Sequence, residues 1–125
     1  MHLIQIGKCA YENAKSKGLY NREISMQERI AQQHSEVSEA FKAIRDGNIV
    51  TVMQDNSISE INSIADDAEF KQQFELNIKD SFEVEQADLI IRVCETSAAM
   101  GYNLDSFVTA TMRYNSLRSY AGKAF

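Results

Sequence analysis

The chain has 125 residues, enough for one ordinary domain, and its 44% hydrophobic and 25% charged residues exclude a disordered polypeptide. Its formal net charge of -5 argues against a protein that binds the nucleic-acid backbone, because such binding requires clustered Lys and Arg. With no long apolar run, no pattern of a secretion signal and only two distant cysteines, we expect a cytoplasmic protein that binds no membrane.

Helical periodicity dominates the first third of the chain, which contains no proline to interrupt it. Apolar residues at helical spacing predict a helix over residues 2–17 that stops at Gly18. Ser25, with Glu28 three residues later, forms a capping-box pattern and predicts a long helix over residues 25–46. One apolar stripe with a period near 3.6 runs along this second helix: Met26, Ile30, Val37, Phe41 and Ile44.

The middle of the chain, residues 48–80, gives weaker signals. Residues 49–53 fit a short strand, but no partner strand is visible. Residues 57–64 and 68–78 each fit a short helical segment. We therefore expect this stretch to be a variable insert or lid.

Two further helices are predicted, over residues 82–100 and residues 104–119, separated by the stop signal Gly101 and followed by a tail at 120–125. The first of them has one apolar face: Ala87, Ile90, Ile91, Cys94 and Ala98. An opposing polar stripe comprises Glu85, Asp88, Arg92 and Glu95. The sequence as a whole thus predicts an all-α chain.

Two carboxylate pairs stand out on the predicted helices. Glu36 and Glu39 form an ExxE pair, and Glu85 and Asp88 form an ExxD pair. Carboxylates three residues apart lie on one helix face, so each pair can share a ligand, although a lone pair is most often a solvated surface. If the two helices pack side by side, four like charges meet and require cations. Mg²⁺ is favoured, because it is a hard ion that prefers oxygen ligands and substrate phosphates.

The neighbours of the ExxE pair indicate how a second helix could reach it. Glu36 lies at the border of the apolar stripe and is followed by Ala40 and Ala43, whose small side chains allow a close approach. Glu39 points away from the stripe. We therefore expect the carboxylates to face a second packing surface rather than the centre of the core.

Three segments resemble the signatures of the MazG-like nucleoside triphosphate pyrophosphohydrolases: HSEVSEAFKAIRDG (34–47), EQADLIIRVCETSAAMGYNLDSF (85–107) and MRYNSLRSYAGKAF (112–125). The similarity covers roughly residues 21–125. It implies a single MazG-like all-α domain over residues 1–125, a helical bundle of the all-α NTP pyrophosphatase type with about four to five helices. The stretch at about 48–80 would be the variable insert.

The resemblance also implies roles for individual residues. The four carboxylates Glu36, Glu39, Glu85 and Asp88 would be the metal ligands and catalytic residues, with Mg²⁺ as the cofactor and Mn²⁺ as a substitute. Contacts with the substrate would come from Asn115, Arg118 and Lys123, and Tyr114 is the tyrosine we favour for stacking on a base. Relatives often carry Lys where this chain has Thr111, and Pro where it has Ser119, so the departures affect substrate contacts and leave the metal ligands intact.

The implied activity is Mg²⁺-dependent hydrolysis of a (d)NTP to a (d)NMP and pyrophosphate, in a homodimer or a dimer of dimers. One alternative is a non-catalytic helical module that keeps the fold and binds nucleotides or a partner protein. A ferritin-like di-iron protein is disfavoured, because that class needs two Glu-x-x-His motifs and neither His2 nor His34 has a Glu three residues before it. Glu95 continues the polar stripe as a further candidate ligand or base.

Overall fold

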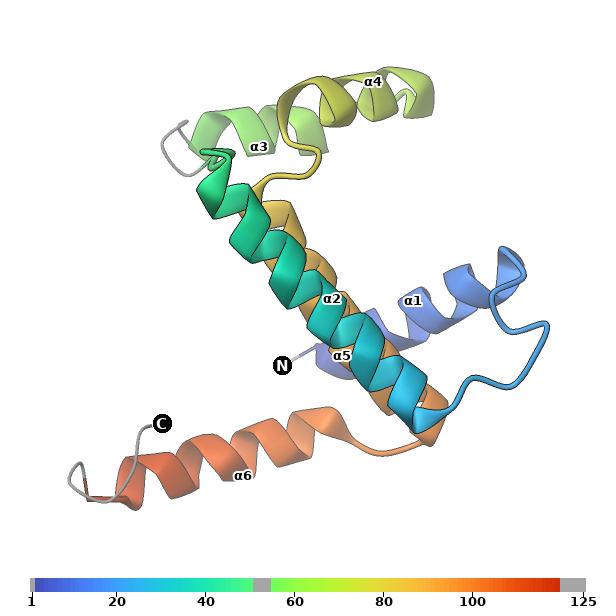
Figure 1. Cartoon of the computed structure of the whole chain (residues 1–125), viewed down its shortest axis with the longest axis vertical. Coiled ribbons are helices and arrows are strands. Elements are labelled where there is room, and N and C mark those ends of the chain that lie inside the picture. Colours follow the sequence, from blue (N-terminus) through green and yellow to red (C-terminus); the bar gives the residue numbers. More distant parts are fainter. Residues whose placement is uncertain (1, 51–54, 120–125) are drawn as a thin grey trace. The chain divides into compact units, whose positions relative to one another are not determined.

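The computed structural model describes residues 2–50 and 55–119 (Figure 1). Within these ranges the chain forms six α-helices and no strand, so the all-α prediction is confirmed, with one or two helices more than expected. None of the described helices is both long and apolar enough to cross a membrane. The chain divides into two compact units, Met1–Ile24 with Ile91–Phe125, and Ser25–Ile90.

The first unit consists of three helical segments. α1 spans Leu3–Ser16, α6 spans Leu104–Leu117, and α5, which spans Phe82–Met100, contributes residues 91–100. The residue predicted to stop α1, Gly18, has a φ of +83°, a conformation that costs glycine little because it has no Cβ. The sequence therefore places both ends of α1 to within one or two residues.

The start of α1 is capped by a distant residue. His2 makes no capping hydrogen bond with its side chain. Instead, the backbone N–H groups of Leu3 and Ile4 donate to the two carboxylate oxygens of Asp105, at 3.1 and 3.0 Å. The first N–H groups of a helix have no partner within the helix, and that end carries partial positive charge, so the carboxylate is favourable there. Since Asp105 lies in the first turn of α6, this contact joins α1 to α6.

α1 approaches α5 closely at Gly7, which is buried. A Cβ at this position would lie 2.4 Å from the backbone oxygen of Cys94 and 3.4 Å from the Cβ of Ala98. Cys94 is itself 1% exposed, and burial, followed by the charge of Asp105, raises the pKa of its thiol. The contact therefore requires glycine on α1 and leaves Cys94 as an unreactive packing residue.

The second unit contains α2 (Met26–Arg45), α3 (Asp55–Asn62), α4 (Asp67–Asn77) and residues 82–90 of α5. The predicted start of α2 is confirmed, since the Oγ of Ser25 accepts a hydrogen bond from the backbone N–H of Glu28 at 3.1 Å. α3 and α4 correspond to the two short helical segments predicted in the middle of the chain. Of the strand predicted at residues 49–53, residues 49 and 50 are not in a strand, and residues 51–53 lie outside the described residues.

The face that α2 buries is not its apolar stripe. Ala40 and Ala43 are 3% and 4% exposed and Glu36 is 8% exposed. The stripe residues, in contrast, are between 48% and 60% exposed: Met26, Ile30, Val37, Phe41 and Ile44. The small and acidic face is therefore the packed face of α2, as expected for a second packing surface, whereas the exposure of the stripe was not predicted.

On α5, residues of both predicted faces are buried. Glu85 and Glu95 of the polar stripe are 5% and 6% exposed and Cys94 of the apolar face is 1% exposed, while Ile90 is 53% exposed. Each buried carboxyl has a specific neighbourhood. Glu95 accepts a hydrogen bond from the hydroxyl of Tyr20 within the first unit, and Glu85 faces the carboxylates of α2 within the second.

Replacing Gly7 by alanine should destabilise the protein by about 1–3 kcal/mol, because the new Cβ must displace backbone of α5. Alanine is otherwise the better helix former by about 1 kcal/mol, so the sign of the effect is diagnostic. Urea unfolding of Gly7→Ala measures it. Gln5→Ala, at an exposed position of the same helix, is the control and should be neutral or stabilising. A stabilised Gly7→Ala variant would contradict the close approach.

Candidate metal centre

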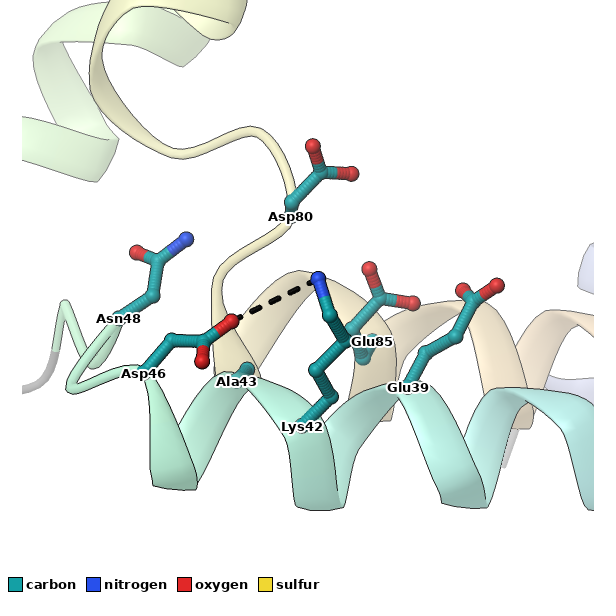
Figure 2. Close-up of a pocket in the computed structure, with 7 residues that line it drawn as sticks. All are labelled: Glu39, Lys42, Ala43, Asp46, Asn48, Asp80 and Glu85. Carbon is teal, nitrogen blue, oxygen red and sulfur yellow. Dashed lines mark ion pairs between the residues drawn. The ribbon is translucent and has the colours of Figure 1, made fainter.

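Three of the four predicted carboxylates meet in the second unit. Glu36, Glu39 and Glu85 can each offer one oxygen such that the three atoms lie within 4.8 Å of one another. The first two come from neighbouring turns of α2, and the third comes from the first turn of α5; Figure 2 shows Glu39 and Glu85 on the two helices. Glu36 and Glu85 are buried and Glu39 is exposed. The cluster therefore has an inner part and an opening to solvent.

The start of α5 is tied to the segment that follows α2. The backbone N–H of Phe82 donates to the carbonyl oxygen of Asn48 at 2.9 Å. The N–H of Val50 donates to the carboxylate of Glu83 at 2.8 Å. These two bonds hold the first turn of α5 against the end of α2, and they thereby set the position of Glu85.

Glu85 has the most perturbed environment in the cluster. Burial raises its pKa to about 7, assisted by Glu39 as a hydrogen-bond neighbour and as a like charge, by the charge of Asp88, and by Glu36. Its Oε2 atom is buried and has no hydrogen-bond partner within the described part of the chain. Two ionised carboxylates cannot hydrogen-bond to each other, because neither carries a proton. The buried oxygen therefore requires either a proton or a cation.

Asp88, the fourth predicted ligand, lies one turn after Glu85 on α5 and is half-buried. Its negative charge contributes to the raised pKa of Glu85, so it is electrostatically part of the site. It does not belong to the group of three oxygens described above. Its role as a ligand stays a prediction, and a shared ion would have to draw its carboxylate inward.

The predicted substrate contacts lie in the other unit, at the end of α6. The guanidinium of Arg118 lies 5.6 Å from the ring centroid of Tyr114, a cation–π contact, and Asn115 is half-buried beside them. Lys123 lies outside the described residues. The structure therefore brings Tyr114 and Arg118 together, and both belong to a different unit from the carboxylates.

Glu95, the further candidate ligand, is engaged elsewhere. It is buried in the first unit and accepts a hydrogen bond from Tyr20, whose ring centroid lies 4.7 Å from that of Tyr11. This carboxyl therefore has a structural partner and does not join the cluster in the second unit.

Sequence reasoning missed the polar residues beside the carboxylates. A cavity of about 280 Å³ opens next to them, lined by Glu39, Lys42, Ala43, Asp46, Asn48, Asp80 and Glu85 (Figure 2). One signal was available for Lys42, since it follows Glu39 by three residues and so lies on the same side of α2. Asp80 gave no such signal, because its place at the cavity depends on the loop between α4 and α5.

No protein-family model, curated protein or solved structure matches this chain. The chemistry of the site is therefore argued from the residues themselves. The donors are all carboxylate oxygens, which suit a hard divalent cation, and one of them, Glu85, also carries the buried, unpartnered Oε2.

The raised pKa of Glu85 predicts how stability depends on pH. Because the protonated form is favoured in the folded state, its stabilisation is complete below the unfolded-state pKa of 4.5 and is lost as the pH rises through about 7. Between about pH 5 and about pH 8 the metal-free protein should lose roughly 2–4 kcal/mol in free energy of unfolding from this group. Millimolar Mg²⁺ should restore stability at the higher pH, because the cation replaces the proton.

Urea unfolding at the two pH values, with EDTA or with Mg²⁺, measures both effects. Glu85→Gln should abolish the Glu85 contribution to the pH dependence and reduce the stabilisation by Mg²⁺. Glu23→Gln, at an exposed carboxylate outside the cluster, is the matched control and should retain both. A Glu85→Gln variant with unchanged pH dependence would show that this carboxyl is not the titrating group.

Proposed function

We propose that the protein is a Mg²⁺-dependent nucleoside triphosphate pyrophosphohydrolase that converts a (d)NTP to a (d)NMP and pyrophosphate. The observation that carries this proposal is the meeting of Glu36, Glu39 and Glu85 around a buried carboxyl oxygen with no partner. The resemblance of the surrounding segments to MazG-like enzymes supplies the reaction class. The two observations are independent, because the resemblance rests on sequence and the unpartnered oxygen on packing.

The donor set fits Mg²⁺ and accepts Mn²⁺ as a substitute, since all donors are oxygens. Glu36, Glu39 and Glu85 would hold the ion, with Asp88 as the fourth ligand. A bound divalent ion would neutralise the phosphates and favour ionisation of the attacking water. A bound cation would also satisfy the buried Oε2 of Glu85, which has no hydrogen-bond partner among the described residues.

The proposed reaction is hydrolysis at the α-phosphorus, assisted by the carboxylates of the cluster. Water attacks the α-phosphorus, the bond from that phosphorus to the bridging oxygen breaks, and the electron pair leaves with pyrophosphate. One carboxylate of the cluster accepts the proton of the water. Glu36 and Glu85 are buried and Glu39 is exposed, so substrate and water would arrive on the Glu39 side of the cluster.

The first test is the identity of the product. The purified chain should hydrolyse at least one nucleoside triphosphate in the presence of Mg²⁺, and pyrophosphate should appear in amounts equal to the monophosphate. A screen of ribo- and deoxyribonucleotides with separate detection of pyrophosphate and orthophosphate measures this. Orthophosphate as the sole product would contradict attack at the α-phosphorus. Nucleotide binding without turnover would instead favour the non-catalytic module.

Variants of the ligands supply the control for this test. Glu39→Gln and Asp88→Asn should abolish activity by weakening metal binding while the fold is retained. Removing one of several like charges should also leave metal-free thermal stability unchanged or raised. A large loss of stability in the metal-free state would mark these carboxylates as structural groups.

The exposed stripe of α2 supports a homo-oligomer built on a two-fold dimer, as a homodimer or a dimer of dimers. Five large apolar side chains at helical spacing are about half exposed or more along one helix face. Contiguous apolar surface of this kind is typically covered by another subunit, and a two-fold axis pairs identical faces. In the proposed enzyme, a neighbouring subunit would help to complete the nucleotide pocket.

The two cysteines, Cys9 and Cys94, are free thiols, which suits the reducing cytoplasm that we propose as the location of the protein.

Light scattering at micromolar concentration should therefore give a mass at least twice that of the chain. Phe41→Glu, which places a charge in the centre of the stripe, should lower the mass toward that of one chain. Ser38→Glu adds the same charge at an exposed position off the stripe and should leave the assembly intact. A stable and fully active monomer would refute the dimer and would require one chain to build the whole pocket.

A further inference from the structure

The cavity beside the carboxylates contains a single cation among the described residues that line it, Lys42. We propose that Lys42 binds the outer phosphates of the substrate, the part that leaves as pyrophosphate. This inference rests on the proposed function and extends it by assigning a phosphate contact to a residue of the same unit as the metal ligands.

Lys42 lines the cavity together with its ion-pair partner Asp46. Its Nζ lies 3.5 Å from an oxygen of Asp46, and the two side chains are 69% and 56% exposed. Figure 2 shows the Lys42 side chain extending from α2, with its ammonium in the ion pair with Asp46. An exposed pair of this kind contributes little to stability, so a phosphate oxygen can replace Asp46 as the partner of the lysine.

The charges of the site require such a group. Even two divalent ions would only balance the three carboxylates of the cluster and Asp88, and would leave the charge of a triphosphate unopposed. Negative charge also increases on the leaving pyrophosphate as its bond to the α-phosphorus breaks, and a positioned cation stabilises that charge. Lys42 can stabilise that charge because it is the one basic residue among the described residues that line the cavity. The acids of the lining, which include Asp46 and Asp80, cannot. Because the metal-free cavity is acidic, phosphate binding should depend on prior metal binding.

The test uses the full chain and inorganic pyrophosphate, whose binding in the presence of Mg²⁺ is measured by calorimetry. Lys42→Ala should weaken pyrophosphate binding about tenfold, as expected for loss of one charge-assisted hydrogen bond at an accessible site. Its affinity for Mg²⁺ alone should match that of the wild type. Lys42→Arg should recover most of the lost pyrophosphate affinity, since it restores the charge.

Arg45→Ala is the matched control. Arg45 lies in the same last turn of α2, its guanidinium contacts the ring of Phe41 at 5.4 Å, and it does not line the cavity. Both variants remove one positive charge. Equal loss of pyrophosphate affinity in the two would show that only the net charge matters, and would overturn the proposal. Asp46→Asn frees Lys42 from its ion pair and should bind pyrophosphate at least as tightly as the wild type. Weaker binding in that variant would make Asp46 a ligand and would also overturn the proposal.

The experiment separates this inference from the proposed function, because pyrophosphate binding needs no turnover. Pyrophosphate binding that is weaker in Lys42→Ala than in the wild type would support the phosphate contact. If the wild type hydrolyses no nucleotide, the same result would still support the contact, while the proposed enzyme would be refuted. Normal pyrophosphate binding in Lys42→Ala would overturn the contact, whether or not the wild type is active.

Discussion

The second unit depends on one constraint, which is that carboxylates are held together on a packed face between two helices. Glu36 and Glu85 are both less than 10% exposed, and Glu36 is among the groups that favour the protonated form of Glu85. Ala40 and Ala43 make this arrangement sterically possible, because their small side chains let α5 come close to α2. Burial and the neighbouring carboxylates together raise the pKa of Glu85. Without a cation, the site therefore relieves the repulsion by retaining a proton on Glu85.

This constraint determines which surfaces remain for other contacts. Because α2 uses its small and acidic face for packing, its large apolar side chains are left exposed. A helix in an isolated globular unit normally does the opposite. Deviations from consistent patterning are expected at functional sites and are compensated elsewhere in the structure. Burial of the stripe by a second copy would provide that compensation, so the proposed site and the proposed dimer follow from the same choice of face.

The sequence predicts well what depends on local chemistry. Ser25 and Gly18 mark helix ends through hydrogen bonding and backbone conformation within a few residues, so those ends could be placed in advance. Helical spacing also fixes the face that each carboxylate motif occupies, so a meeting of the motifs could be predicted on the condition that the two helices pack side by side. The exposure of the α2 stripe was not, since periodicity shows that a face is apolar but not what covers it. The capping of α1 by Asp105 could not be predicted either, because the two are about one hundred residues apart.

The same electrostatics impose an order on binding in the proposed enzyme. A chain with net charge -5 and an acidic cavity repels a triphosphate until cations have entered. A cation that enters must first displace the proton of Glu85, which is only partly ionised near neutral pH. A phosphate oxygen could then replace Asp46 as the partner of Lys42, because this exposed ion pair contributes little to stability. Metal binding would thus change the cavity from one that rejects anions to one that holds them, using groups contributed by α2 and α5.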